Sequence, residues 1–247
     1  MESGLLYYDI EQKFQKLAVG EIFDNSYFNV ELTKATSLTK YLSTKVEKGQ
    51  LTRFTKGKYY KPKNTIFGTL MPNSQQLIKS ITHQNGKTIG YITGTKAYQE
   101  RRLTTQLPNI IVIAIQGKSK PKLRIGNYQF KFVKRHFDFT NEQIPLLQLL
   151  DALKDIKRIP DASVSETIQN VKEILREMNT NDVKIMVQLA QYYPLFVKAL
   201  LGAIVQEVQN NVAIDLLFQK LNPLTFYKIG VKKGDFKVSK ALENTLI

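Results

Sequence analysis

The stretch of sequence that decides the fold reads Ser37-Leu-Thr-Lys-Tyr-Leu-Ser-Thr-Lys-Val-Glu-Lys-Gly49 and continues as Gln50-Leu-Thr-Arg-Phe-Thr-Lys-Gly-Lys-Tyr-Tyr-Lys-Pro62. Its first half predicts one amphipathic helix that ends at Gly49, because glycine readily adopts the left-handed conformation found after helix ends. Its second half predicts two short strands joined by a tight turn at Thr55-Lys-Gly57. A helix, a strand, a basic turn and an aromatic strand in this order are typical of the recognition helix and wing of a winged helix-turn-helix.

The predicted helix has one apolar face and one polar face. At about 100° per residue, its apolar side chains fall in one stripe with the i, i+3, i+4, i+8 spacing of a helix that packs on a core; they are Leu38, Tyr41, Leu42 and Val46. We expect Lys45, at the edge of this stripe, to extend along it. The opposite face carries small hydroxyl side chains and a cation, which can approach base edges and phosphates. The candidate DNA-contacting residues of the helix and its end are Thr36, Lys40, Ser43, Thr44 and Lys48.

Positive charge is concentrated in this region. Between Lys34 and Lys63 there are nine Lys or Arg residues and one acid, Glu47, which gives a net charge of +8 over thirty residues. This excess is greater than solubility requires and favours a nucleic-acid partner. A solvated basic hairpin on another kind of small α+β domain is the alternative interpretation. The candidate DNA-contacting residues of the wing are Arg53, Lys56, Lys58 and Lys61.

Length and composition bound the class of protein. A chain of 247 residues is long enough for two or three small domains with cores of their own. The absence of cysteine excludes disulfides, thiolate zinc sites and cysteine nucleophiles, and it is consistent with a reducing cytoplasm. No secretory signal is visible, and apolar runs such as Ile110–Ile115 are far too short to span a membrane. We therefore expect a cytoplasmic protein with no membrane partner.

Charge divides the chain into three segments. Residues 1–63 have a net charge of +4, residues 64–140 of +10 and residues 141–247 of +1. We expect an α+β protein with an N-terminal winged helix-turn-helix DNA-binding domain (1–63), a small basic α/β segment (64–140) and an all-α C-terminal segment (141–247). The last two segments are expected to pack together as one domain. Because the first two segments carry nearly all of the positive charge, we expect the basic part and the near-neutral helical part to have different functions.

Hydrophobic periodicity and capping residues predict the remaining elements. Before the recognition helix we expect a helix at 9–17, a strand or turn at 20–23 and a short capped helix at 24–28; a linker is expected at 63–69. The middle segment is expected to hold a helix at 73–82, a strand at 88–92, a helix from 95, a strand at 110–115 and a hairpin of strands 123–125 and 129–133. Helices are then expected at 142–155, 163–178, 181–191, 195–209 and 212–221.

The residue patterns that could support catalysis are incomplete. Gly86-Lys-Thr88 resembles the end of a phosphate-binding loop, but Ile81 occupies the position of the first glycine and a strand is expected to follow. The two histidines, His83 and His136, have no metal-binding arrangement around them, and we expect His83 to cap a helix end. No G-x-S-x-G motif is present.

Acidic residues do not form a catalytic set either. Residues 64–140 contain only Glu100 and Asp138, which is too few for a two-metal nuclease. Asp151 and Asp155, spaced i, i+4, are expected on a solvated helix face. We therefore predict no catalytic residue, no metal site, no cofactor and no enzymatic activity.

Several phrases spread along the chain form one pattern. They are Gly20-Glu-Ile-Phe23, Val46-Glu-Lys-Gly-Gln-Leu-Thr-Arg-Phe-Thr-Lys-Gly-Lys-Tyr-Tyr-Lys-Pro62, Thr93-Gly-Thr-Lys-Ala97, Leu103-Thr-Thr-Gln-Leu-Pro108, Tyr193-Pro194, Lys198-Ala-Leu-Leu-Gly-Ala203 and Leu221-Asn-Pro-Leu-Thr225. Together they resemble the AbiEi-type antitoxins, the transcriptional regulators of type IV toxin–antitoxin (abortive infection) systems. Lys45 departs from the pattern, which usually has an aliphatic residue at that position.

The resemblance implies a function in two parts. The N-terminal domain would repress its own operon by binding operator DNA, and the remainder would counteract a nucleotidyltransferase-like toxin without necessarily forming a stable complex with it. The residues by themselves leave open a stand-alone winged-helix transcriptional regulator, or an RNA-binding protein that uses the basic middle segment. A neighbouring gene for a nucleotidyltransferase-like protein would favour the antitoxin, and tighter binding to RNA than to promoter DNA would favour the last alternative.

A second basic cluster lies in the middle segment. Its six cations fall within 24 residues and have only Glu100 beside them. We expect this cluster to hold an anionic partner, such as the nucleic-acid substrate, the nucleotide or an acidic surface of the toxin. A solvated rim or additional non-specific DNA contact is the alternative. The expected antitoxin surface consists of Arg101, Arg102, Lys118, Lys120, Lys122 and Arg124.

Overall fold

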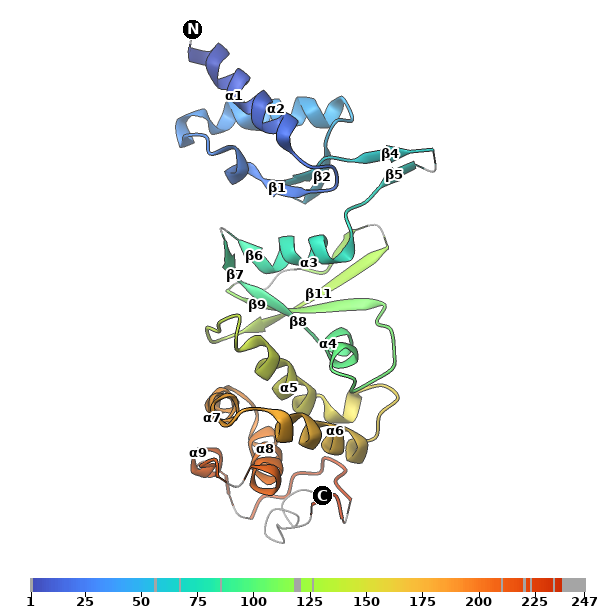
Figure 1. Ribbon diagram of the computed structural model, residues 1–247, viewed down its shortest axis with the longest axis vertical. Coiled ribbons are helices and arrows are strands. Elements are labelled where there is room, and N and C mark those ends of the chain that lie inside the picture. Colours follow the sequence, from blue (N-terminus) through green and yellow to red (C-terminus); the bar gives the residue numbers. More distant parts are fainter. Residues whose placement is uncertain are drawn as a thin grey trace. The chain divides into compact units, whose positions relative to one another are not determined.

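The protein has a mixed α+β fold (Figure 1). The computed structural model describes residues 2–236, except for positions 56, 67, 85, 118–120, 126, 210, 220, 223 and 233. The chain divides into two compact units, Met1–Ile89 with Arg124–Tyr128, and Gly90–Leu123 with Gln129–Ile247. Residues 64–89, which belong to the basic middle segment by charge, are thus grouped with the N-terminal region.

Two helices form the core of the first unit. α1 (Glu2–Lys16) begins earlier than the helix expected at 9–17 and buries Ile10 and Phe14. α2 (Ala35–Glu47) confirms the helix predicted ahead of Gly49, and it buries Leu38 and Leu42 in the same cluster. Gly49 has a φ of +69°, the left-handed conformation for which a glycine was expected there.

A strand and two short 3-10 helices connect α1 to α2. β1 (Ile22–Asp24) leads into η1 (Asn25–Phe28), and η2 (Leu32–Lys34) precedes α2. The Asp24 side chain accepts hydrogen bonds from the N–H and the hydroxyl of Ser26, at 2.9 and 2.5 Å, and so caps η1 as predicted. Phe28, at the end of η1, is fully buried.

Three strands of the first unit form an antiparallel sheet in the order β1-β3-β2. β2 (Thr52–Thr55) and β3 (Lys58–Tyr60) are the strands predicted on either side of the basic turn. Thr52 on one side and Ile22 on the other both pair with Tyr60. The rings of Phe23 and Tyr59 stack with centroids 6.0 Å apart, which joins the sheet to the helical core.

The segment expected to be a linker at 63–69 lies inside the first unit and contains paired strands, so that expectation was wrong. β4 (Lys63–Thr65) and β5 (Gly68–Leu70) pair antiparallel, with Thr65 opposite Gly68. The two strands satisfy their backbone N–H and C=O groups by pairing with each other, which requires no apolar periodicity and leaves little signal in the sequence.

The rest of the first unit is a capped helix and a hairpin. α3 (Ser74–Thr82) begins with a capping box, in which Asn73 and Gln76 each accept the other's backbone N–H, at 2.8 and 3.3 Å. His83 is the C-cap of α3, as predicted. β6 (His83–Gln84) and β7 (Lys87–Thr88) form a two-stranded sheet, so Lys87 and Thr88 do not open a helix as a phosphate-binding loop requires.

A four-stranded sheet runs in the order β10-β11-β9-β8. Its strands are β8 (Gly90–Thr93), β9 (Ile110–Gln116), β10 (Leu123–Ile125) and β11 (Tyr128–Arg135), and α4 (Thr95–Glu100) follows β8. β9 is antiparallel to β8 and parallel to β11. The strand expected at 88–92 is divided between β7 and β8, because the N–H of Ile89 bonds to the carbonyl of Thr82, at 2.7 Å.

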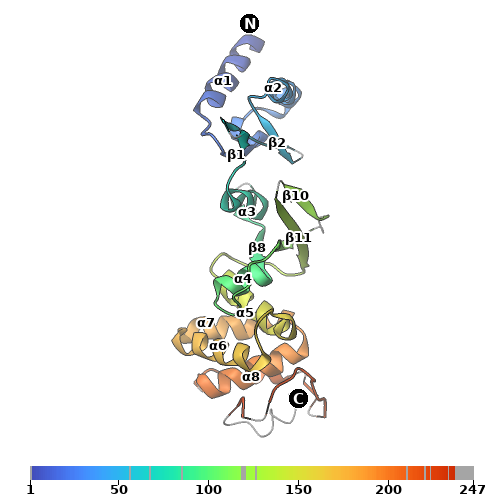
Figure 2. The same ribbon diagram turned by 90° about the vertical axis from the view of Figure 1, so that its right-hand side faces the viewer.

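The C-terminal helices confirm most of the helical expectations. α5 (Ile144–Lys154), α6 (Val164–Glu177), α7 (Thr180–Leu189) and α8 (Leu195–Val208) lie within or close to the predicted ranges. The 3-10 helices η3 (Ile156–Arg158) and η4 (Ala190–Tyr192) follow α5 and α7. Together with β8, these helices share one large core, in which α8 packs against α5, α6 and α7 (Figure 2).

The prediction of a helix at 212–221 was wrong in length, since among the described residues of this range only those of α9 (Asp215–Phe218) are helical. Tertiary packing explains the difference. Val212 is held in a turn that bonds to Gln209, at 3.0 Å. Phe218 packs so closely on α8 that a Cβ on Gly202 would lie 2.7 Å from its ring. Among the described residues, no helix is long and apolar enough to cross a membrane.

Candidate nucleic-acid interface

Helix α2 presents an uncovered polar face. Leu38 and Leu42 hold the helix on the core of the first unit. On the other side Thr36, Lys40 and Thr44 are exposed at i, i+4 and i+8, and Ser43 is half-buried beside them. The Thr44 hydroxyl donates to the Lys40 carbonyl at 3.1 Å. This hydrogen bond is local, so the hydroxyl can exchange it for one to a base edge at little cost in free energy. The helix therefore offers short polar groups and one long cation to a partner.

Contacts between α1 and α2 hold this helix in place. The Tyr41 hydroxyl donates to Glu11 at 2.5 Å, and Lys45 pairs with the same carboxylate at 3.0 Å. The Lys45 ammonium also lies 4.4 Å from the centroid of the Phe14 ring. Lys45 thus extends along the apolar stripe, as predicted. The hydrogen bond from Tyr41, and then that from Lys45, lowers the pKa of Glu11 to about 2.

Two of the cations predicted to contact DNA remain exposed at the end of α2 and in β2. Lys48 follows the last turn of α2, and Arg53 lies on β2. The Arg53 guanidinium donates to the Tyr59 hydroxyl at 3.3 Å and lies 5.6 Å from the centre of that ring. This contact orients the guanidinium without burying it, as suits a phosphate contact. Lys56, at the turn, lies outside the described residues.

Two other predicted DNA contacts are engaged within the protein. Lys58 is half-buried and donates to the carbonyl of Ser80 in the last turn of α3. Lys61 is half-buried, with its ammonium 5.3 Å from the centroid of the Phe14 ring. Both side chains pack the strand β3 and its continuation onto neighbouring elements. In the sequence, Lys58 and Lys61 look the same as Lys48 and Arg53, which remain exposed.

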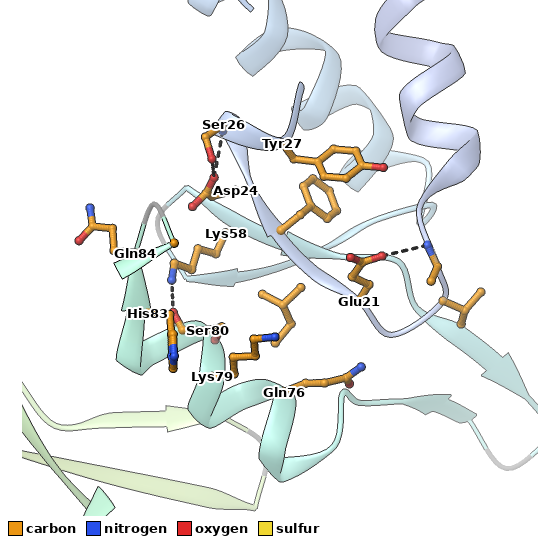
Figure 3. A pocket seen from close by; sticks show the side chains of 15 residues that line it. Glu21, Asp24, Ser26, Tyr27, Lys58, Gln76, Lys79, Ser80, His83 and Gln84 are labelled. Atoms are coloured by element: carbon orange, nitrogen blue, oxygen red, sulfur yellow. Dashed lines mark hydrogen bonds between the residues drawn. The ribbon is translucent and has the colours of Figure 1, made fainter. Parts of the chain in front are cut away.

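A polar cavity of about 560 Å³ lies beside Lys58 (Figure 3). It is lined by η1, β1, β3 and α3, with Asp24 and Lys58 on one side and Gln76, Lys79 and His83 of the α3 segment on the other. The Lys58–Ser80 hydrogen bond crosses it. Since the carbonyls of the last turn carry the negative end of the helix dipole, the ammonium is well placed to hold α3 against the sheet.

The second expected basic surface is divided by the fold. Arg101 is half-buried and donates two hydrogen bonds to the Gln148 side chain, at 3.2 and 2.9 Å. Burial lowers the pKa of Arg101. Gln148 in turn donates to the Ile92 carbonyl at 2.9 Å, so Arg101 ties α4 to α5 and is not the free surface cation that we expected.

The other members of the expected antitoxin surface have different positions. Arg102 and Lys122 are exposed in the second unit. Arg124 is exposed in the segment grouped with the first unit. Arg102 has a φ of +59°, and the turn directs the chain from α4 into Leu103, which is buried. Lys118 and Lys120 lie outside the described residues.

The second unit contains a buried ionic network that was not predicted from the sequence. Asp151, expected on a solvated face, is 3% exposed and pairs with Arg135 from the end of β11. Its carboxylate also accepts hydrogen bonds from Tyr91, Thr93 and Tyr193, at 3.1, 2.6 and 2.8 Å. An acid inside the apolar run Leu146–Leu153 was the signal for this burial, because a solvated face would not be apolar on both sides.

The network affects the pKa of its members in a consistent direction. Burial by itself would lower the pKa of Arg135, but the charge of Asp151 together with the interactions with Tyr193 and Tyr91 more than offsets this and raises it. Burial, and then the charge of Asp151, raises the pKa of Tyr91 and of Tyr193. Arg135 therefore stays charged, and Tyr91 and Tyr193 stay neutral, at neutral pH. This indicates a structural role for the network, which joins β8, β11, α5 and the segment before α8.

Comparison with known proteins gives a family and a fold. The sequence matches a protein family described as "Family of unknown function (DUF6088)" over residues 9–183. No curated protein matches it. The fold is similar to that of the Rv2827c protein from Mycobacterium tuberculosis, known from a crystal structure, with a TM-score of 0.54 and 10% sequence identity. The similarity covers 96% of this chain and 88% of the other, and at this identity it concerns the fold alone.

Proposed function

This protein belongs to the DUF6088 family of unknown function, and we propose that its N-terminal residues 1–63 bind duplex DNA as a winged helix-turn-helix. In this assignment α2 is the recognition helix and the β2–β3 hairpin is the wing. The assignment is supported by the element order α1, β1, η1, η2, α2, β2, β3 and by the sheet order β1-β3-β2. A helix that enters the major groove while a neighbouring element contacts the backbone is the common geometry of such modules.

One observation carries the proposal: the polar face of α2 is uncovered and lies at the start of a stretch without acids. Thr36, Lys40 and Thr44 are exposed on it. No Asp or Glu occurs between Glu47 and Glu100. Electrostatic binding to phosphates requires such an excess of cations, and recognition of bases requires short polar groups on the helix.

We further propose that the protein represses its own operon and acts as an antitoxin against a nucleotidyltransferase-like toxin. This part rests on the resemblance of its sequence to the AbiEi-type antitoxins. The second unit is assigned to the antitoxic activity, and a stable complex with the toxin is not required. A stand-alone transcriptional regulator remains the second candidate, since the uncovered face of α2 would serve it equally.

The DNA-binding proposal is tested by titrating the full-length protein against labelled duplexes and measuring fluorescence anisotropy. We expect the duplex upstream of its own gene to bind at least 10-fold more tightly than a scrambled duplex or single-stranded RNA of the same sequence. Changing Thr36, Lys40 and Thr44 together to alanine should remove this preference. The matched control is Lys184→Ala, which removes one exposed cation from α7. Equal binding of all three nucleic acids, or unchanged preference in the triple variant, contradicts the proposal.

The antitoxin proposal is tested separately by co-expression with a neighbouring nucleotidyltransferase-like gene. Wild-type protein should restore growth. The triple variant of α2 should also restore growth, because its second unit is unchanged, while it fails to repress the promoter. If the wild-type protein does not restore growth but represses its promoter, the stand-alone regulator is the correct assignment.

A further inference from the structure

A second cavity, of about 530 Å³, lies within the second unit. It is formed by the end of α5 with η3, by the start of α8 and by residues 226–229. Ile156 and Ile229, which are 1% and 5% exposed, line it together with Phe196. Its size and its apolar lining are those of sites that bind small molecules.

One hydroxyl group of the cavity lining has no hydrogen-bond partner among the described residues. Tyr227 lines the cavity, and its hydroxyl oxygen is buried. Three other tyrosines of this unit, Tyr91, Tyr98 and Tyr193, are also buried, and each donates its hydroxyl to the Asp151 or Asp155 carboxylate. A buried hydroxyl without a partner is unfavourable, so a molecule in the cavity that meets it after a small turn of the Tyr227 side chain would gain affinity.

The cavity also has an excess of positive charge. Asp155 is its only acidic lining residue among those described, and the Asp155 carboxylate already accepts a hydrogen bond from Tyr98, at 2.8 Å. Phe226, at the rim, is 59% exposed, so its ring is available to stack on a ligand. The cations of the lining are Lys154, Lys157, Arg158 and Lys228.

We propose that this cavity binds a small aromatic molecule that carries one anionic group and a hydroxyl. The rings lie between Phe226 and the apolar lining, the anion is held by the cations at the rim, and the hydroxyl pairs with Tyr227. This site is independent of the DNA-binding proposal, because all its lining residues belong to the second unit. A ligand there would give the protein a small-molecule input besides its nucleic-acid partner.

The experiment uses the full-length protein, isothermal titration calorimetry and two probes, 6-hydroxy-2-naphthoate and 2-naphthol. We expect 6-hydroxy-2-naphthoate to bind one site per chain with a Kd of about 1 mM or below, the range for a ligand of this size. The uncharged 2-naphthol should bind at least fivefold more weakly, since it lacks the carboxylate. Binding that does not saturate, or equal affinity for the two probes, overturns the proposal.

Matched variants locate the site. Tyr227→Phe should weaken the binding of 6-hydroxy-2-naphthoate at least threefold. It should not lower the melting temperature, because the hydroxyl that it removes is unpaired in the free protein. Tyr192→Phe is the control, since Tyr192 is 62% exposed, stacks on Phe137 and lies outside the cavity. Arg158→Gln should weaken binding about twofold or more, and Lys184→Gln, on α7, should leave it unchanged. Equal affinity in Tyr227→Phe and Tyr192→Phe overturns the assignment to this cavity.

Discussion

Glu11 couples α1 to the candidate recognition helix, and its effect on stability should depend on pH. Its pKa is lowered from 4.5 to about 2 by the hydrogen bond from Tyr41 and then by Lys45. Because the folded pKa lies below the unfolded one, the carboxylate stabilises the fold above pH 4.5, and this contribution is lost as the pH falls toward 2. The Glu11 side chain is 37% exposed, so screening by solvent reduces the contribution to about 1 kcal/mol.

We therefore expect Glu11→Gln to lower the free energy of unfolding at pH 7 and to match wild type as the pH approaches 2. Urea denaturation at several pH values measures the difference. Glu31→Gln is the control, because Glu31 pairs with Lys34 at 3.4 Å while 74% exposed. A difference between Glu11→Gln and wild type that stays constant with pH would show that the loss is due to packing and not to charge.

Asp151 is the centre of a buried polar network in the second unit. Asp151→Asn would leave Arg135, whose side chain is 9% exposed, buried opposite a neutral group. We expect it to destabilise the protein by about 3–5 kcal/mol. Asp155→Asn is the matched control, since this carboxylate accepts one hydrogen bond from Tyr98 and is half-buried; we expect a loss of about 1 kcal/mol. If denaturation curves gave the two variants the same free energy of unfolding, a central role for the Arg135–Asp151 pair would be contradicted.

At the scale of elements, the cations of α2 and of the β2–β3 hairpin divide into two groups with different expected effects. Lys40, Lys48 and Arg53 are exposed, and each that contacts a phosphate should contribute about 0.9 to the slope of log K against log salt concentration. Changing each to alanine should flatten the slope by that amount. Lys58→Ala should instead lower the melting temperature, because the bond to the Ser80 carbonyl is lost.

Binding of each variant to the promoter duplex at several salt concentrations measures these slopes. Lys184→Ala, in the second unit, should leave both the slope and the affinity unchanged. If Lys58→Ala flattens the slope as much as Arg53→Ala does, Lys58 exchanges its internal hydrogen bond for a phosphate when DNA binds.

At the scale of the whole molecule, the two hydrophobic cores have no residue in common. One core comprises residues between Ile10 and Tyr59, and the other begins at Tyr91. We expect two thermal transitions, since separate cores can unfold separately. Leu42→Ala should lower the midpoint temperature of one transition and Leu147→Ala that of the other. Each substitution should reduce the free energy of unfolding of its unit by about 2–5 kcal/mol. Both leucines are fully buried, so the comparison is matched. A single transition that both variants lower alike would mean that the chain unfolds as one cooperative unit.

The sequence by itself determined the elements whose signals are local. The apolar stripe around Leu42 and the left-handed Gly49 specify α2 and its end, and the turn at 55–57 specifies the hairpin. Capping residues such as Asp24 and Ser163 mark the helix starts. Each of these features depends on neighbours within one or two turns of the chain, so periodicity and capping rules were sufficient to predict them.

Only the tertiary structure decided which polar residues are covered and which strands pair. Asp151 looks like a solvated acid in the sequence, but the fold brings to it Arg135, 16 residues before it, and Tyr91, 60 residues before it. In the same way Arg101 meets Gln148, and β9 pairs in parallel with β11. The physical reason is that burial and pairing depend on what lies across a contact, and residues far apart in the chain leave no periodic signal of their meeting.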